Sequence, residues 1–198
     1  MRASLLLIAA MMTAGWAGRT LAAETNDADY YPLKVGNQWT YDLTSDGEKS
    51  TLVVRIVKEE EVDGVMLYRL EAETDGEISV TEHLRVTDEG VYRCRRNGAQ
   101  IEPPLCVIKF PIKQGDNWEG EARVGREDFD ITGSTTLDEV EVPFGKFSAA
   151  KVIITTSENG MKIRSTDWFA PGVGMVKQVM RFGDREMLYE LVDFTAGA

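Results

Sequence analysis

Turn-forming residue pairs divide this chain into short segments. Asp-Gly and Asn-Gly pairs supply the positive φ angles that two-residue hairpin turns need. Between the pairs lie runs of strand length that are rich in β-branched and aromatic residues, and no sustained helical periodicity follows residue 23. The pattern predicts an all-β, antiparallel fold in which hairpins set the strand order. The pairs are Asp46-Gly47, Asp63-Gly64, Asp75-Gly76, Asn97-Gly98, Asn159-Gly160 and Gly183-Asp184.

About ten strands are expected from these runs. In the clearest, residues 77–87, apolar and polar residues alternate, and only Glu82 interrupts the apolar face. Strict alternation predicts one face in the core and one in water. The predicted strand ranges are 38–45, 50–60, 65–74, 77–87, 90–96, 118–124, 127–140, 147–157, 160–169, 174–182 and 186–194.

One octet occurs twice in the sequence. Residues 32–39 (PLKVGNQW) return as residues 111–118 (PIKQGDNW), 79 positions later, with Pro, Lys, Gly and Trp identical. Each octet stands at the head of a strand-rich stretch. We therefore expect two tandem pseudo-repeats, at about 32–110 and 111–195.

The two pseudo-repeats are expected to form one domain, residues 24–198. No Ser/Pro-rich linker separates them, and the junction at Phe110-Pro111 is apolar. Each repeat alone would leave an apolar face uncovered, so the two should pack or merge. The merged sheet can close into a barrel, fold as a sandwich or stay open as a half-barrel, and periodicity alone does not choose among these. The expected architecture is a half-barrel or curved sheet, with a β-sandwich as the alternative.

Residues 1–23 have the features of a secretory signal peptide. Arg2 supplies the positive start, an apolar stretch follows, and small residues at Ala22 and Ala23 suit cleavage. The apolar stretch is shorter than the about 20 residues of a membrane-spanning helix, and it contains no cysteine for an acyl anchor. We expect a protein exported to the periplasm or the extracellular space, with no membrane span and no acyl anchor.

The chain is acidic, with a formal net charge of −11. Because residues 1–23 hold two arginines and no acid, the remainder would carry −13. Nucleic acid and anionic membranes reward lysine and arginine, so neither is an expected partner. Solubility is the simplest role for this charge, and a basic partner or a divalent cation is the alternative.

Cys94 and Cys106 are the two cysteines of the chain. An oxidising compartment favours a disulfide between them. The segment that they bracket contains Asn97-Gly98 and Pro103-Pro104, so it must turn. Two unpaired buried thiols are the alternative.

Three stretches carry a family resemblance: residues 32–41 (PLKVGNQWTY), 142–147 (VPFGKF) and 168–177 (WFAPGVGMVK). In this order they resemble a broad group of uncharacterised bacterial exported proteins and lipoproteins. That group shows a PLxxGNxWxY opening, a VPxGxF turn and a WYAPGVGLVK-like strand pair. Some members look like half-barrels related to lipoprotein carriers, so the resemblance implies that architecture. It implies no activity.

Catalytic and metal-binding patterns are sparse. His83 is the single histidine, predicted to be exposed on the polar face of strand 77–87, so a His/Cys zinc cluster is excluded if the cysteines are paired. No Gly-x-Ser-x-Gly elbow or glycine-rich phosphate loop is present. The acidic clusters 59–61 and 127–130 are most simply solvated. We expect no catalytic residue, metal or cofactor, with a carboxylate hydrolase as the least favoured alternative.

Aromatic residues are the remaining candidates for a site. Trp39 and Tyr41 share a strand face, and Trp118 is the repeat equivalent of Trp39. Such residues either anchor a core or line a groove for a ligand. The candidate ligand-binding residues are Trp39, Tyr41, Trp118 and Trp168.

The predicted function is that of a non-enzymatic exported protein. It would bind a lipid or another apolar or amphiphilic ligand in the concavity of its sheet, driven by the burial of apolar surface. The alternative is an interaction or structural module of the cell envelope, whose exposed strand edges would pair with a partner protein.

Overall fold

Twelve strands make up most of the computed structural model, which describes residues 26–158 and 161–198. The predicted signal peptide and the Asn159-Gly160 turn lie outside these residues. A short 3₁₀ helix, η1 (Asp27–Tyr30), precedes the strands, and none of the helices within the described ranges could cross a membrane. The strands are β1 (Gln38–Ser45), β2 (Glu48–Val62), β3 (Val65–Thr74), β4 (Glu77–Thr87), β5 (Gly90–Arg96), β6 (Ala99–Lys109), β7 (Asp116–Val124), β8 (Glu127–Val142), β9 (Gly145–Glu158), β10 (Met161–Ala170), β11 (Gly174–Phe182) and β12 (Arg185–Thr195).

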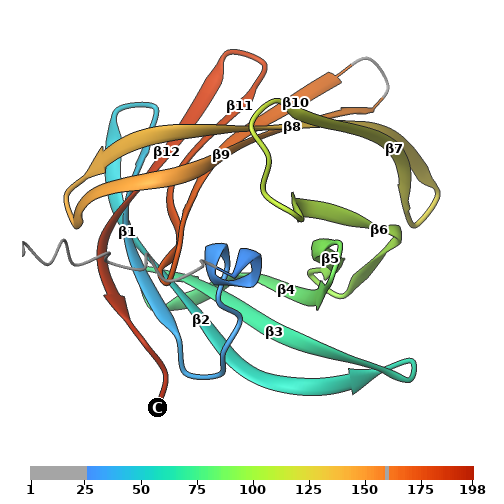
Figure 1. Cartoon of the computed structure of the whole chain (residues 1–198), viewed down its shortest axis with the longest axis horizontal. Helices are drawn as coiled ribbons and strands as arrows, with labels where there is room; N and C mark the ends of the chain where they lie inside the picture. Colours follow the sequence, from blue (N-terminus) through green and yellow to red (C-terminus); the bar gives the residue numbers. More distant parts are fainter. Residues whose placement is uncertain (1–25, 159–160) are drawn as a thin grey trace, which may run out of the picture.

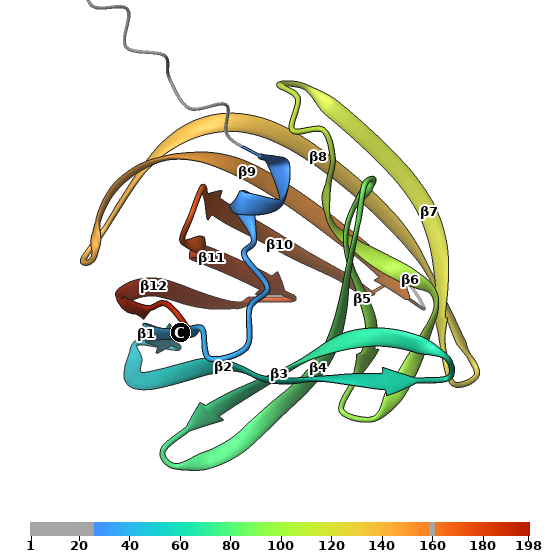
Figure 2. The ribbon, with the colours of Figure 1, turned by 60° about the horizontal axis from the view of Figure 1, so that its bottom comes forward.

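The strands form one closed antiparallel barrel (Figures 1 and 2). Each strand pairs with its neighbours in sequence, and β1 pairs with β12 to complete the circuit. The all-β, antiparallel prediction is confirmed. The expected half-barrel or curved sheet of about ten strands is wrong, as is the sandwich, because the first and last strands meet in a long ladder that periodicity cannot reveal.

Strand β6 is absent from the sequence-based prediction. It contains Pro103 and Pro104, which have no backbone N–H to give to a ladder and therefore argue against a strand. The structure accommodates them because the pairing of β5 with β6 is interrupted between Arg93 and Arg95. The segment between Cys94 and Cys106, which was expected to turn, is therefore part of a bulged hairpin.

The barrel is closed unevenly. Strands β6 and β7 meet through two residue pairs, Ile101 with Val124 and Glu102 with Arg123. On the other side, β1 and β12 are paired from Gln38 to Ser45. We call the β6–β7 contact the seam. It lies between two units of six strands each, β1–β6 and β7–β12.

The repeated octets make the same turn before each unit. Gly36 and Gly115 both have positive φ, 90° and 79°. The Gly36 N–H donates to the Ile56 carbonyl at 2.9 Å, and the Gly115 N–H donates to the Thr135 carbonyl at 2.8 Å. Ile56 and Thr135 are themselves 79 positions apart, so the likeness extends beyond the octets into the first hairpin of each unit.

The N-terminal segment fills one end of the barrel. In Figure 2, η1 and the residues after it lie within the ring of strands before the chain enters β1. The Gly172 N–H, in the β10–β11 turn, donates to the Asp29 carbonyl at 2.8 Å. The Ile112 N–H, ahead of β7, donates to Asp27 Oδ1 at 3.1 Å. These bonds tie the segment to the second unit and to the link that leads into it, and we call this end the floor.

Candidate functional site

The inner face of the barrel follows from alternation and register. Asp167, Gln178, Tyr189 and Leu43 are consecutive Cα partners across β10, β11, β12 and β1, so they form one row on one face. Tyr189 and Leu43 are both buried, which identifies this face as the inner one. Residues two positions further along each strand form the next rows toward the floor or away from it.

Trp39 and Tyr41 lie in the packed half near the floor. Their exposed fractions are 1% and 2%. Trp39 Nε1 donates to the Val173 carbonyl at 2.6 Å, and the Tyr41 hydroxyl donates to the Met175 carbonyl at 2.7 Å. Burial raises the pKa of Tyr41 well above its ordinary value. Both side chains attach the β10–β11 hairpin to β1, so the structure places them in the core.

Trp118 holds the equivalent place in the second unit but has different surroundings. It is half-buried, and its ring lies against Gly133, its Cα partner on β8. Trp39 has Val54 as its partner on β2. Trp118 Nε1 is buried without a hydrogen-bond partner within the described part of the chain.

Trp168 lies on the outer face, between the inward-facing Asp167 and Phe169. Its Nε1 donates to Asp138 Oδ2 at 3.3 Å, and Lys151 Nζ stands 5.2 Å from its ring centroid. Asp138 and Lys151 belong to the β8–β9 hairpin, which crosses β11 and β12 in Figure 1. The four candidate aromatic residues therefore do not converge on one site.

The end of the barrel opposite the floor has an apolar inner face that is only partly covered. Ile163 is 40% exposed, and Met180, Phe182 and Met187 are half-buried. Ile163 pairs with Phe182 and Met180 pairs with Met187, on the same face as Tyr189. We call these four residues the mouth. Toward the floor, by contrast, inner residues such as Leu191 are fully buried.

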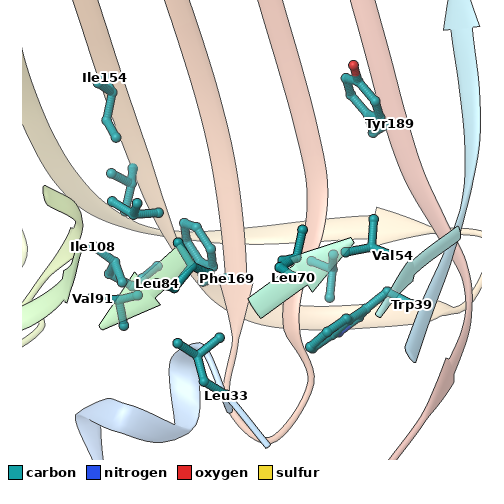
Figure 3. Packing of buried hydrophobic residues seen from close by; sticks show 14 of the residues in the cluster. Leu33, Trp39, Val54, Leu70, Leu84, Val91, Ile108, Ile154, Phe169 and Tyr189 are labelled. Carbon is teal, nitrogen blue, oxygen red and sulfur yellow. The ribbon is translucent and has the colours of Figure 1, made fainter. Parts of the chain in front are cut away.

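The core residues drawn in Figure 3 are likewise packed more closely near the floor than further along the strands. Leu84 and Phe169 lie close together above Leu33, which comes from the N-terminal segment, and Trp39 lies to one side of them near Val54, its partner on β2. Ile154 and Tyr189 stand apart from this group, further along their strands. The barrel is therefore tightly packed at the floor, and solvent reaches its inner face at the mouth.

A polar shelf lies directly beneath the mouth. Asp167 Oδ1 accepts hydrogen bonds from Ser165 Oγ and Gln178 Nε2, both at 2.7 Å. Asp167 is buried, whereas Ser165 and Gln178 are half-buried, and Ser165 is the Cα partner of the mouth residue Met180. Burial raises the pKa of Asp167 to about 6 in spite of these hydrogen bonds. The shelf presents polar atoms to whatever enters the mouth.

An ion pair faces the shelf from β4 and β5. Arg93 Nε lies 2.8 Å from Glu82 Oε2, and the two side chains are 23% and 10% exposed. The Arg93 charge lowers the pKa of Asp167 and the Glu82 charge raises it. Burial raises the pKa of Tyr31, and Glu82 adds to this effect. The interior thus collects charged groups from both units around a tyrosine of the N-terminal segment.

Sequence reasoning missed Asp167, Gln178 and Arg93 as site residues. One signal was present: Glu82 interrupts the apolar face of β4, and an inward acid needs a buried partner. No local pattern marks the others, because Asp167 and Glu82 lie on strands that are far apart in sequence.

His83 is buried, so the expected exposed histidine is wrong. Its exposed fraction is 9%, and its Nε2 lies 2.8 Å from Glu60 Oε1. Lys58 and His83 together lower the pKa of Glu60 to about 2. The reason is that β2 and β3 extend beyond β4 as a hairpin whose residues cover the outer face of β4, a contact that alternation does not predict.

Cys94 and Cys106 are free thiols, so the predicted disulfide is not formed in this structure. The Cα partner of Cys106 is Tyr92, which makes Cys94 a diagonal neighbour. Diagonal neighbours lie roughly 7–8 Å apart, beyond the usual Cα separation of a disulfide, about 4.4–6.8 Å. Burial raises the pKa of Cys106 to about 11 and also raises that of Cys94.

Metal-binding side chains do not gather in the described ranges 26–158 and 161–198. No group of three or more His, Cys, Asp or Glu side chains there could hold a metal ion. The acidic cluster 127–130 is used in part by an ion pair between Asp128 and Arg123, and Glu60 of the cluster 59–61 contacts Lys58 and His83.

Comparison with known proteins finds the fold but no close relative. No protein-family model and no curated protein sequence matches the chain. A predicted exported protein with a YmcC-like fold from Bacteroides fragilis superposes with a TM-score of 0.51 and 16% identity, over 84% of this chain and 98% of that one. A predicted lipoprotein from Parabacteroides distasonis gives 0.50 and 14%, with the same coverage. At these identities the likeness concerns the fold alone.

Proposed function

We propose that this chain is an exported, non-enzymatic binding protein that holds an apolar or amphiphilic molecule at the mouth of its barrel. One observation carries the proposal. Inward-facing Ile163, Met180, Phe182 and Met187 are apolar yet partly exposed, whereas inner residues nearer the floor are fully buried. A folded protein gains stability by covering such side chains, and a ligand would cover them here.

The side chains of the mouth and the shelf indicate what kind of ligand would bind. Each Å² of apolar surface removed from water contributes about 25 cal/mol. Methionine side chains adapt to ligands of varied shape, and two of the four mouth residues are methionines. Ser165, Gln178 and Asp167 offer hydrogen bonds to a hydroxyl, amide or ammonium group. An amphiphile with a small hydrogen-bonding head fits both parts.

Export is the second part of the proposal. The signal-like residues 1–23 support it, and so do the descriptions of the two structural neighbours as an exported protein and a lipoprotein. We place the mature protein in the periplasm or outside the cell. A lipid is the natural amphiphile of that compartment.

Binding of the fluorescent apolar probe N-phenyl-1-naphthylamine to the purified protein tests the ligand-binding part. We expect an increase in probe fluorescence, and we expect Met187→Lys to weaken probe binding at least tenfold because it places a charge among the mouth residues. Met66→Lys is the matched control, because Met66 is 55% exposed on β3 and belongs to neither mouth nor shelf.

Thermal unfolding of both variants checks that they are folded. The proposal fails if the probe does not bind the parent protein, or if Met187→Lys and Met66→Lys bind it equally well. Dodecanol should displace the probe from the mouth. A protein that co-purifies with the chain and occupies the mouth would instead favour the alternative function, an interaction or structural module of the cell envelope.

A further inference from the structure

A cavity of about 160 Å³ lies apart from the mouth, between the tip of the β2–β3 hairpin and strands β4, β5 and β6. A cavity of similar volume holds one benzene molecule in an engineered protein. The β3–β4 ladder begins at Tyr68, so the hairpin tip continues past β4. An ion pair of 2.9 Å between Asp63 and Arg95 fixes the tip to β5. The lining includes Val65, Leu67, Arg85, Cys94, Ile101 and Pro104.

Arg85 is the unusual member of this lining. Its Nε is buried without a hydrogen-bond partner, and among the described residues it has no carboxylate within ion-pair distance. Its guanidinium lies 5.9 Å from the ring centroid of Tyr92, which holds it in place without neutralising it. A buried N–H left unpaired costs free energy that an incoming acceptor would recover. The Arg85 guanidinium can therefore donate a hydrogen bond to an anion that enters the cavity.

The other charged residues of the lining are Asp63, Arg95 and Glu102. Asp63 forms an ion pair with Arg95, and Glu102 is exposed. The Arg85 charge lowers the pKa of the Cys94 thiol, though burial raises it more, which places Arg85 close to the cavity wall that Cys94 forms. Arg85 is thus the charged residue of the lining whose N–H is buried without a hydrogen-bond partner within the described residues, in a chain that is acidic overall.

We propose that this cavity binds a small organic carboxylate. The carboxylate would accept hydrogen bonds from the Arg85 guanidinium, and the apolar part would pack on Leu67 and Ile101, which are 4% and 5% exposed. Its size limits the apolar part to about one aromatic ring. This site is independent of the mouth.

Titration of the ¹⁵N-labelled protein with sodium benzoate, followed by NMR, tests this proposal. We expect saturable shifts confined to residues around the cavity, with a dissociation constant on the order of 1 mM or tighter. Arg85→Gln should weaken binding at least tenfold. Arg164→Gln is the matched control, since Arg164 is exposed and lies outside the cavity.

A second variant, Val65→Trp, keeps the test decisive if Arg85→Gln does not fold. Val65→Trp adds a ring at the hairpin tip, where Val65 is 37% exposed, and should block the cavity without changing charge. The proposal is overturned if benzoate at about 10 mM leaves the spectrum of the parent protein unchanged, or if folded Arg85→Gln and Val65→Trp both bind benzoate as the parent does. Equal binding of inorganic phosphate and benzoate would also overturn it, because the apolar wall would then contribute nothing.

Discussion

The indole of Trp118 lies on the backbone of Gly133, in the space that a Cβ at position 133 would occupy. Gly133→Ala is therefore expected to destabilise the protein by about 2 kcal/mol, because the methyl group must displace a packed ring. Urea unfolding of the two proteins measures the difference.

The double variant Gly133→Ala/Trp118→Ala provides the control. Once the ring is removed, the added methyl group should cost little, so the two substitutions should be strongly non-additive. Additive losses would show that the ring does not obstruct position 133.

The two repeat tryptophans should differ in their contribution to stability. Trp39→Phe removes a buried hydrogen bond to Val173 and leaves unfilled space, at an expected cost of about 3 kcal/mol. Trp118→Phe should cost about 1 kcal/mol or less, since this side chain is half-buried and its N–H has no partner within the described residues. Denaturant unfolding followed by tyrosine circular dichroism compares them, and equal losses would contradict the assignment.

Asp167 should make the stability depend on pH. Its pKa in the folded protein is raised from 3.8 to about 6, so the folded state holds its proton more tightly than the unfolded state does. The free energy of unfolding should therefore fall as pH rises from about 4 to about 6.5, by at most about 3 kcal/mol from this group. Asp167→Asn should flatten this part of the profile.

Urea unfolding at a series of pH values measures the effect. Asp184→Asn, in the exposed β11–β12 turn, is the control and should keep the parent slope. An unchanged slope in Asp167→Asn would mean that another group causes the dependence.

Backbone exchange should reveal the weak seam. Strand β7 meets β6 in two residue pairs, whereas its equivalent β1 is paired along its length on both sides. Hydrogen exchange measured by mass spectrometry should therefore be faster in peptides covering residues 116–124 than in those covering 38–45. Equal protection of the two strands would show that the seam does not open more easily than the rest of the barrel.

Local chemistry made most of the strands predictable. Asp46 and Gly47, for example, have φ of 51° and 83°, as the Asp-Gly pattern requires. Closure was not predictable, since the ladder that joins β1 to β12 depends on curvature accumulated over the whole sheet. Strand β6 was hidden because Pro103 and Pro104 argue against a strand unless a bulge accommodates them.

The candidate site was less predictable than the fold. Trp39 and Tyr41 were recognisable as important, but their core position follows from the packing of the β10–β11 hairpin against β1. Asp167 and Gln178 become neighbours only through the register of β10 with β11. Glu82 is an acidic residue in the otherwise apolar face of β4, and it was the one local sign of a polar interior.

The seam also bears on how this molecule behaves among copies of itself. Unpaired strand edges recruit strands from other chains and start aggregation. Here Pro103 and Pro104 remove N–H donors from the β6 edge, and Glu119, Glu121 and Arg123 place charges along β7. The barrel can therefore open locally along the seam without exposing a strand edge on which another copy of the chain could pair.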